Sequence, residues 1–146
     1  MRELFEETGI LLVHGETPAE NVVEVHRRSI TSGQASFARF LRAYDLRPAP
    51  ERLRYMGRLV TPPTEPRRFD TRFFLAVLSE GDRYEENRVQ NGELIDQGWF
   101  YPEDILSGRM ADFPLIPPTR YALEVISVFP TPEAAWEAFA PVIFKN

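Results

Sequence analysis

Cysteine is absent from the 146 residues of this chain. Without it, the chain cannot form disulfide bonds, use a thiol nucleophile or bind zinc through cysteine, and the redox environment stays undetermined. The chain also lacks an apolar run close to the roughly 20 residues that span a membrane as a helix, and no secretory signal opens it. We therefore expect a cytoplasmic protein that makes no use of a membrane.

Positive charge is in deficit as well. The chain has 17 lysines and arginines against 22 aspartates and glutamates, a formal net charge of −5 at pH 7. Nucleic-acid binding generally depends on lysines and arginines that neutralise many phosphates, so a nucleic-acid partner is not expected. Histidine occurs twice, and neither His14 nor His26 has a serine or cysteine partner arrangement nearby in the sequence, so we expect both to be non-catalytic.

What the chain does contain is typical of a globular protein. Hydrophobic residues make up 43% and charged residues 27% of a chain long enough for one domain with a real core. Eight of its 13 prolines cluster at 48–50, 62–66 and 114–118, and strong apolar patterns lie between these clusters. The prolines therefore separate secondary-structure elements, and we expect a single domain over residues 1–146.

Apolar spacing predicts both helices and strands along the chain. Phe37, Phe40, Leu41 and Tyr44 recur at the spacing of one helix face. Thr131, followed by a proline and an acid, is typical of a helix start. Helices are expected at 18–29, 37–44 and 102–106, and two more are expected to begin at Thr119 or nearby and at Thr131. Strands are expected at 10–13, 54–61, 67–78 and 93–101.

The segment at 67–78 is the strongest predicted strand. Its two alternating faces both become apolar towards its end, which favours a central strand covered on both sides. Phe73 and Leu75 should then be almost fully buried. The order of helices and strands predicts an α/β (α+β) architecture in which helices flank a mixed sheet.

The first ten residues carry the clearest chemical signal. Glu3, Glu6 and Glu7 lie at spacings of three and four, which place side chains on one face of a helix. Three like charges repel each other unless a cation lies between them, and a hard ion such as Mg²⁺ prefers oxygen ligands. Gly9 follows as a plausible helix stop. For the three carboxylates alone, an ordinary solvated helix face is the alternative interpretation.

The order of these residues resembles the second half of the Nudix box, the signature of the Nudix hydrolase family. The full box reads Gly-x5-Glu-x7-Arg-Glu-U-x-Glu-Glu-x-Gly-U, where U is an aliphatic residue. The resemblance implies a Nudix-like α/β/α sandwich and Mg²⁺- or Mn²⁺-dependent hydrolysis of a diphosphate linked to another group. It also implies that Glu3, Glu6 and Glu7 bind the metal. The matching residues are Arg2, Glu3, Leu4, Glu6, Glu7, Gly9 and Ile10, among which Arg2 and Gly9 have structural roles.

The chain begins inside this box, without the upstream glycine and glutamate of the family pattern. In the family the box arginine pairs with that glutamate, so we expect Arg2 to lack its usual partner. A helix that opens at residue 1 or 2 also has no N-cap side chain, and its α-ammonium lies at the positive end of the helix dipole. We expect an N-terminally truncated domain without its first strands, whose open sheet edge could support a homo-oligomer.

A second group of carboxylates precedes Trp99. Residues 92–106 resemble the late strand and short helix of the family, where a carboxylate before a tryptophan approaches the metals or acts as the base. Glu93 is the expected catalytic residue of this segment, and Glu3 is the other candidate for the base. Asp96, Glu86 and Glu85 are alternatives to Glu93, and a purely solvated role stays open for each of them.

Residues 60–74 contain three arginines in a stretch that resembles the branch of the family with the peroxisomal coenzyme A diphosphatase. Arg67, Arg68 and Arg72 could make charge-assisted contacts to the diphosphate of a small-molecule substrate. The alternative is that Arg67 and Arg68 are solvated and that Arg72 pairs with a carboxylate such as Asp70.

Two functions follow from these observations. The first is Mg²⁺- or Mn²⁺-dependent hydrolysis of the diphosphate linkage in a nucleoside diphosphate derivative, coenzyme A or a similar molecule. The second is a non-catalytic Nudix remnant, or a domain that binds metal or associates with a partner.

Overall fold

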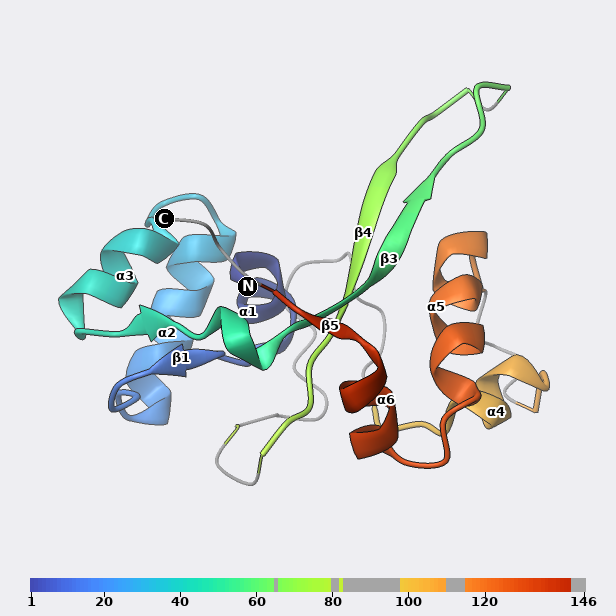
Figure 1. Cartoon of the computed structure of the whole chain (residues 1–146). Coiled ribbons are helices and arrows are strands. Elements are labelled where there is room, and N and C mark those ends of the chain that lie inside the picture. The colour runs from blue at the N-terminus through green and yellow to red at the C-terminus, as the bar shows by residue number, and fades with distance from the viewer. Residues whose placement is uncertain (65, 80–81, 83–97, 110–114, 143–146) are drawn as a thin grey trace. The chain divides into compact units, whose positions relative to one another are not determined.

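The computed structural model describes residues 1–64, 66–79, 82, 98–109 and 115–142 (Figure 1). Internal contacts divide the chain into two compact units. The first consists of Met1–Pro50 and Leu78–Gly98, and the second of Glu51–Val77 and Trp99–Asn146. The single domain expected over residues 1–146 stays a prediction.

The first unit combines three helices with a short antiparallel ladder in its described part. Val13 of β1 lies opposite Pro48 of β2, and His14 lies opposite Arg47. The strand predicted at 10–13 therefore begins only at Val13, the last residue of that range, and extends to His14. The elements are α1 (Arg2–Thr8), β1 (Val13–His14), α2 (Glu20–Thr31), α3 (Phe37–Ala43) and β2 (Arg47–Pro48). The 3₁₀ helix η1 (Pro50–Arg52) begins at the last residue of the segment Met1–Pro50 and continues into the second unit.

A cluster of buried side chains holds the first unit together. Phe5 of α1 is completely buried, and its ring stacks on that of Phe40 at 5.6 Å between centroids. The ring of Phe37 lies 5.5 Å from Phe5, and Leu41 is also buried. The helical spacing of 37–44 is thus confirmed, and it supplies the surface against which α1 packs.

The second unit is built on an antiparallel sheet with the strand order β4-β3-β5. β3 and β4 form a long hairpin (Figure 1), in which Arg54 pairs with Leu75 and Val60 with Asp70. The register shifts between Tyr55 and Gly57. The elements are β3 (Arg54–Val60), β4 (Asp70–Leu75), α4 (Pro102–Leu106), α5 (Pro117–Ser127), α6 (Pro132–Ala138) and β5 (Ala140–Pro141).

The near-complete burial predicted for Phe73 and Leu75 in the strand at 67–78 is wrong, while the central position of this strand in the sheet stays a prediction. The strand covers Asp70–Leu75, and among the described residues it pairs with β3 alone. Phe73 and Leu75 are half-buried, and Phe74 on the opposite face is 45% exposed. The ring of Phe73 packs near Tyr121 of α5, with 6.3 Å between centroids. The face of β4 that carries Phe73 is therefore covered in part by an aromatic residue of α5.

The helix start predicted at Thr131 is confirmed. Its hydroxyl accepts a hydrogen bond from the backbone N–H of Ala134 at 3.2 Å, and Pro132 occupies the first helical position. Trp136 of this helix is half-buried, with the guanidinium of Arg54 3.8 Å from its ring centroid.

None of the helices in the described ranges is both long and apolar enough to cross a membrane.

Candidate functional site

Helix α1 carries all three glutamates of the predicted metal site. Its inward side is anchored by Phe5, while Glu3 and Glu7 are exposed and Glu6 is half-buried. Met1 stands at the N-cap without a side-chain hydrogen bond, as expected for a helix that opens at residue 2. Because no cap contributes, burial of Phe5 is a main source of the stability of this helix.

Arg2 is paired with two of the predicted metal ligands. Its Nη1 lies 2.6 Å from Oε2 of Glu6, and its Nη2 lies 3.3 Å from Oε1 of Glu3. The box arginine therefore has two acidic partners on its own helix. A metal ion that binds Glu3 and Glu6 has to compete with this guanidinium.

The end of α1 is defined by two local hydrogen-bond patterns. Gly9 adopts a left-handed conformation with φ of +79°, and its N–H donates to the carbonyl of Phe5 at 2.9 Å. The hydroxyl of Thr8 donates to the carbonyl of Leu4 at 2.6 Å and accepts from the N–H of Ile10 at 3.2 Å. The helix stop predicted at Gly9 is confirmed, since only glycine adopts this conformation at little cost.

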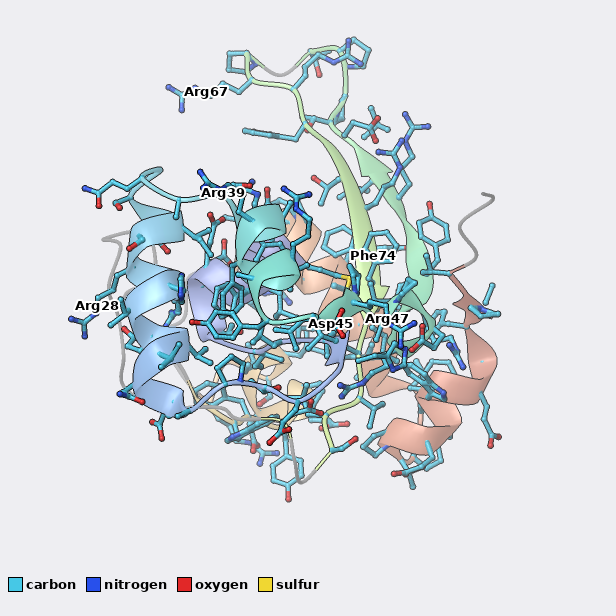
Figure 2. The ribbon with its side chains drawn as sticks, turned by 90° about the vertical axis from the view of Figure 1, so that its left-hand side faces the viewer. Arg28, Arg39, Asp45, Arg47, Arg67 and Phe74 are labelled. Carbon is cyan, nitrogen blue, oxygen red and sulfur yellow. The ribbon has the colours of Figure 1, made fainter. Side chains whose placement is uncertain are left out.

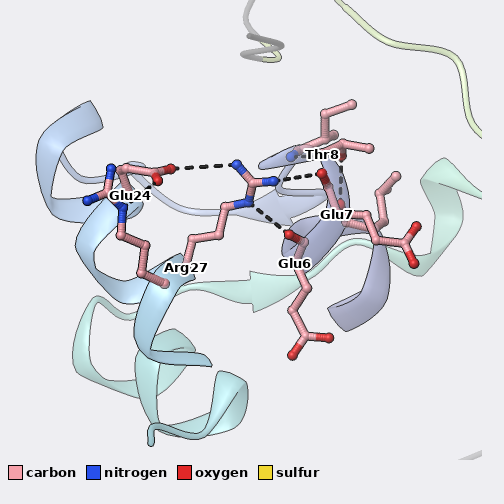
Figure 3. A network of polar contacts seen from close by, with 8 residues as sticks. Glu6, Glu7, Thr8, Glu24 and Arg27 are labelled. Atoms are coloured by element: carbon pink, nitrogen blue, oxygen red, sulfur yellow. Dashed lines mark hydrogen bonds and ion pairs between the residues drawn. The ribbon is translucent and has the colours of Figure 1, made fainter. Parts of the chain in front are cut away.

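A buried arginine from α2 contacts the same end of α1 (Figure 3). Nε of Arg27 donates to the carbonyl of Glu6 at 2.9 Å, and Nη2 donates to the carbonyl of Glu7 at 2.6 Å. Nη1 lies 3.6 Å from Oε2 of Glu24, and the residue is 4% exposed. The carboxylates of Glu6 and Glu7 point away from Arg27 (Figure 3).

Arg27 was not predicted from the sequence, although the spacing of its neighbours carries a signal for it. Val23, Arg27 and Ile30 lie at i, i+4 and i+7, the spacing of one helix face. Val23 packs against the core and Ile30 belongs to it. A charged residue between two core residues has to find polar partners, because an unpaired buried charge is costly.

The donor chemistry of α1 suits a hard divalent ion, since all three candidate ligands supply carboxylate oxygens. In the part of the chain that the structure describes, however, no three histidine, cysteine, aspartate or glutamate side chains lie close enough together to hold a metal. The assignment of Glu3, Glu6 and Glu7 therefore stays a prediction. Glu93 and its alternatives, Glu85, Glu86 and Asp96, lie outside the described residues.

The arginines of the β3–β4 hairpin have different surroundings. Arg68 and Arg67 are exposed, and Arg67 projects outward near the hairpin tip (Figure 2). Nη2 of Arg72 lies 3.9 Å from Oδ2 of Asp70, the structural pairing that was the alternative to substrate binding. Whether the three arginines contact substrate stays a prediction.

Asp70 has a closer partner that the sequence did not indicate. Nε of Arg58 lies 2.5 Å from Oδ1 and Nη2 lies 2.7 Å from Oδ2, a two-pronged pair across the hairpin. The hydrogen bond from Arg58 lowers the pKa of Asp70, and the same contact raises the pKa of Arg58. This pair ties β3 to β4 on the exposed face of the sheet.

Comparison with known proteins gives one clear relationship. The fold is similar to the crystal structure of a Nudix hydrolase from Alicyclobacillus acidocaldarius, with a TM-score of 0.78 and 31% sequence identity. The match covers 97% of this chain and 65% of the other, so the chain spans a little less than two thirds of that protein. No protein-family model and no curated protein matches the chain.

This neighbour confirms the Nudix-like α+β fold. It also supports the resemblance to the Nudix family that the residues of α1 indicate. The ladders formed by the described strands are all antiparallel, so the parallel pairing that a mixed sheet requires is not among them.

Proposed function

We propose that this chain is a Nudix-type pyrophosphohydrolase that uses Mg²⁺ or Mn²⁺. The observation that carries the proposal is the location of the seven matching box residues. Five of them lie in α1, Gly9 ends that helix and Ile10 follows it, in a fold similar to that of a Nudix hydrolase. Sequence pattern and fold therefore favour the same class of enzyme.

Glu3, Glu6 and Glu7 would hold the divalent ion through their carboxylate oxygens. A bound divalent ion neutralises negative charge on the diphosphate and lowers the pKa of a bound water. The side chain of Arg2 would release Glu6 to make this oxygen available. Glu93 or Glu3 would take the proton from the attacking water, and Arg67, Arg68 and Arg72 would orient the phosphates.

The proposed substrate is a nucleoside diphosphate derivative, with coenzyme A as the first candidate. Support comes from residues 60–74, whose order resembles the coenzyme A diphosphatase branch. Two of the three arginines in this stretch, Arg67 and Arg68, lie at the exposed end of the hairpin. A flexible anionic molecule could reach them there.

The test is a hydrolysis screen with coenzyme A, dinucleotide polyphosphates and nucleotide sugars. Each is incubated with the chain in the presence of Mg²⁺, of Mn²⁺ and of a chelator, and phosphorylated products are quantified. Metal-dependent splitting of one of these diphosphates supports the proposal. Absence of both turnover and Mn²⁺ binding would refute it.

A second candidate function is a non-catalytic domain that binds metal weakly or self-associates. Two observations favour it. Glu3 and Glu6 are engaged by Arg2, and β4 pairs on one side only within the described strands. Mn²⁺ binding without hydrolysis, together with a dimer or larger species in sedimentation, would favour this function over the first.

A further inference from the structure

We infer that Arg27 is a positioning residue: it fixes the last turn of α1 and thereby sets where Glu6 and Glu7 present their carboxylates. The inference rests on the proposed function, because this placement affects chemistry only if those carboxylates bind the metal. Nothing in the Nudix box itself includes Arg27, which lies 21 residues after Glu6.

The geometry of Arg27 is that of a clamp on the backbone. Two nitrogens of one guanidinium donate to two successive carbonyls, those of Glu6 and Glu7. A planar guanidinium that bonds two neighbouring acceptors restricts rotation as well as translation of the turn that carries them. Because both acceptors are backbone atoms, these two hydrogen bonds do not use the carboxylates of the same two residues (Figure 3).

The position of Arg27 also explains why a buried charge is tolerated there. Carbonyls at the end of a helix lack intrahelical partners and carry the negative end of the helix dipole, so they favour a cation. Glu24 adds a carboxylate at 3.6 Å. A Cβ at Gly9 would lie 3.7 Å from Nη1 of Arg27, so the guanidinium packs directly beside the helix stop.

Arg28 is a matched control on the same helix. Its Nε lies 3.0 Å from Oε1 of Glu24, so both arginines share that acid. The side chain of Arg28 is 63% exposed, and its Nε donates a hydrogen bond to the carboxylate of Glu24, a residue of its own helix. Replacing Arg28 therefore removes a similar charge and the same acidic partner without touching the backbone of α1.

The experiment compares Arg27→Met, Arg27→Lys and Arg28→Met with the wild-type chain. Mn²⁺ affinity is measured by electron paramagnetic resonance of the free ion, and the fold is checked by circular dichroism. Residues that orient metal ligands typically change metal affinity by about 10–100-fold, and Arg27→Met should weaken Mn²⁺ binding by this factor. Arg27→Lys should weaken it less, because an ammonium keeps the charge but not the planar fork. Arg28→Met should bind like the wild type.

A folded Arg27→Met that binds Mn²⁺ as tightly as the wild type would overturn the inference. If Arg27→Met does not fold, Arg27→Lys decides: weakened binding supports the inference, and wild-type affinity refutes it. Hydrogen exchange of the α1 amides gives a readout that needs no metal. If the wild type neither binds Mn²⁺ nor hydrolyses a diphosphate, the proposed function fails on its own. Unchanged hydrogen exchange at Gly9 in the Arg27 variants would separately refute the clamp.

Discussion

The guanidinium of Arg2 lies 2.6 Å from the carboxylate of Glu6, four residues later on α1. This ion pair occupies an oxygen that the proposed metal needs, so the two cations compete. Exposed ion pairs contribute at most about 1 kcal/mol, which limits the effect of removing one to roughly fivefold. Arg2→Met should therefore tighten Mn²⁺ binding by no more than this factor. Weaker binding in titrations of Arg2→Met would instead show that Arg2 holds Glu6 in position.

Removal of the Glu6 charge should disable the site without unfolding the chain. Glu6→Gln keeps the shape of the side chain but removes the anionic oxygen that a hard cation prefers. Mn²⁺ affinity should fall by more than about tenfold, since a direct ligand matters at least as much as its supporting residues. Metal-dependent turnover should fall with it. Glu16→Gln, an exposed acid outside α1, is the control, and unchanged turnover in Glu6→Gln would refute the metal-site assignment.

Burial of Phe5 should dominate the stability of the first unit. The side chain is fully buried between Phe37 and Phe40, so truncation leaves a cavity. Phe5→Ala should lower the free energy of unfolding by about 3–5 kcal/mol, measured by urea denaturation. Phe69→Ala, at a position 63% exposed, should change it by less than about 0.5 kcal/mol. Equal effects of the two substitutions would contradict the packing described for α1.

Gly9 should resist substitution because of its backbone rather than its surroundings. Its φ is +79°, and a Cβ there would meet Arg27 only at ordinary contact distance. Gly9→Ala should cost about 1–2 kcal/mol of unfolding free energy, and Gly9→Asn less, because asparagine enters this conformation more readily. Gly33→Ala, with φ of +73° and open space around it, should cost a similar amount. A much larger cost at Gly9 in thermal unfolding would point to steric disruption of Arg27.

Asp70 should contribute stability that is lost in acid. Its pKa in the folded chain lies below the ordinary value of 3.8, chiefly because Arg58 donates hydrogen bonds to its carboxylate. A lowered folded pKa means that the contribution is present above the unfolded pKa and is lost as pH falls through the folded pKa. Asp70→Asn should thus be less stable than the wild type near neutral pH, and the difference should shrink below pH 3.8. Urea midpoints that differ equally at all pH values would contradict this.

Several features of the site could be predicted because they depend on residues close together in the sequence. The helix at α1 and its stop at Gly9 follow from spacing and from the conformational freedom of glycine. The buried residues of 37–44 and the cap at Thr131 follow in the same way. The resemblance of residues 2–10 to the Nudix box also implied the kind of fold, which the structural neighbour confirms.

The failures lie where one sequence pattern permits two environments. The two apolar faces of 67–78 predicted cover on both sides, yet Phe74 is 45% exposed. Arg2 was expected to lack the upstream glutamate of the box, and its pairing with Glu3 and Glu6 on its own helix was not predicted. Alternation identifies a strand but does not say how many neighbours the strand has, and a long arginine side chain can reach several acids.

The sequence by itself determined the acidic helix, its glycine stop and the chemistry of its carboxylates, because these depend on residue types within two helical turns. The tertiary structure alone decided that Phe5 is fully buried and that Arg27 bonds the carbonyls of Glu6 and Glu7. Those contacts join segments 20 or more residues apart. Which distant surfaces meet depends on how whole elements pack, and that is not encoded in the spacing of any one segment.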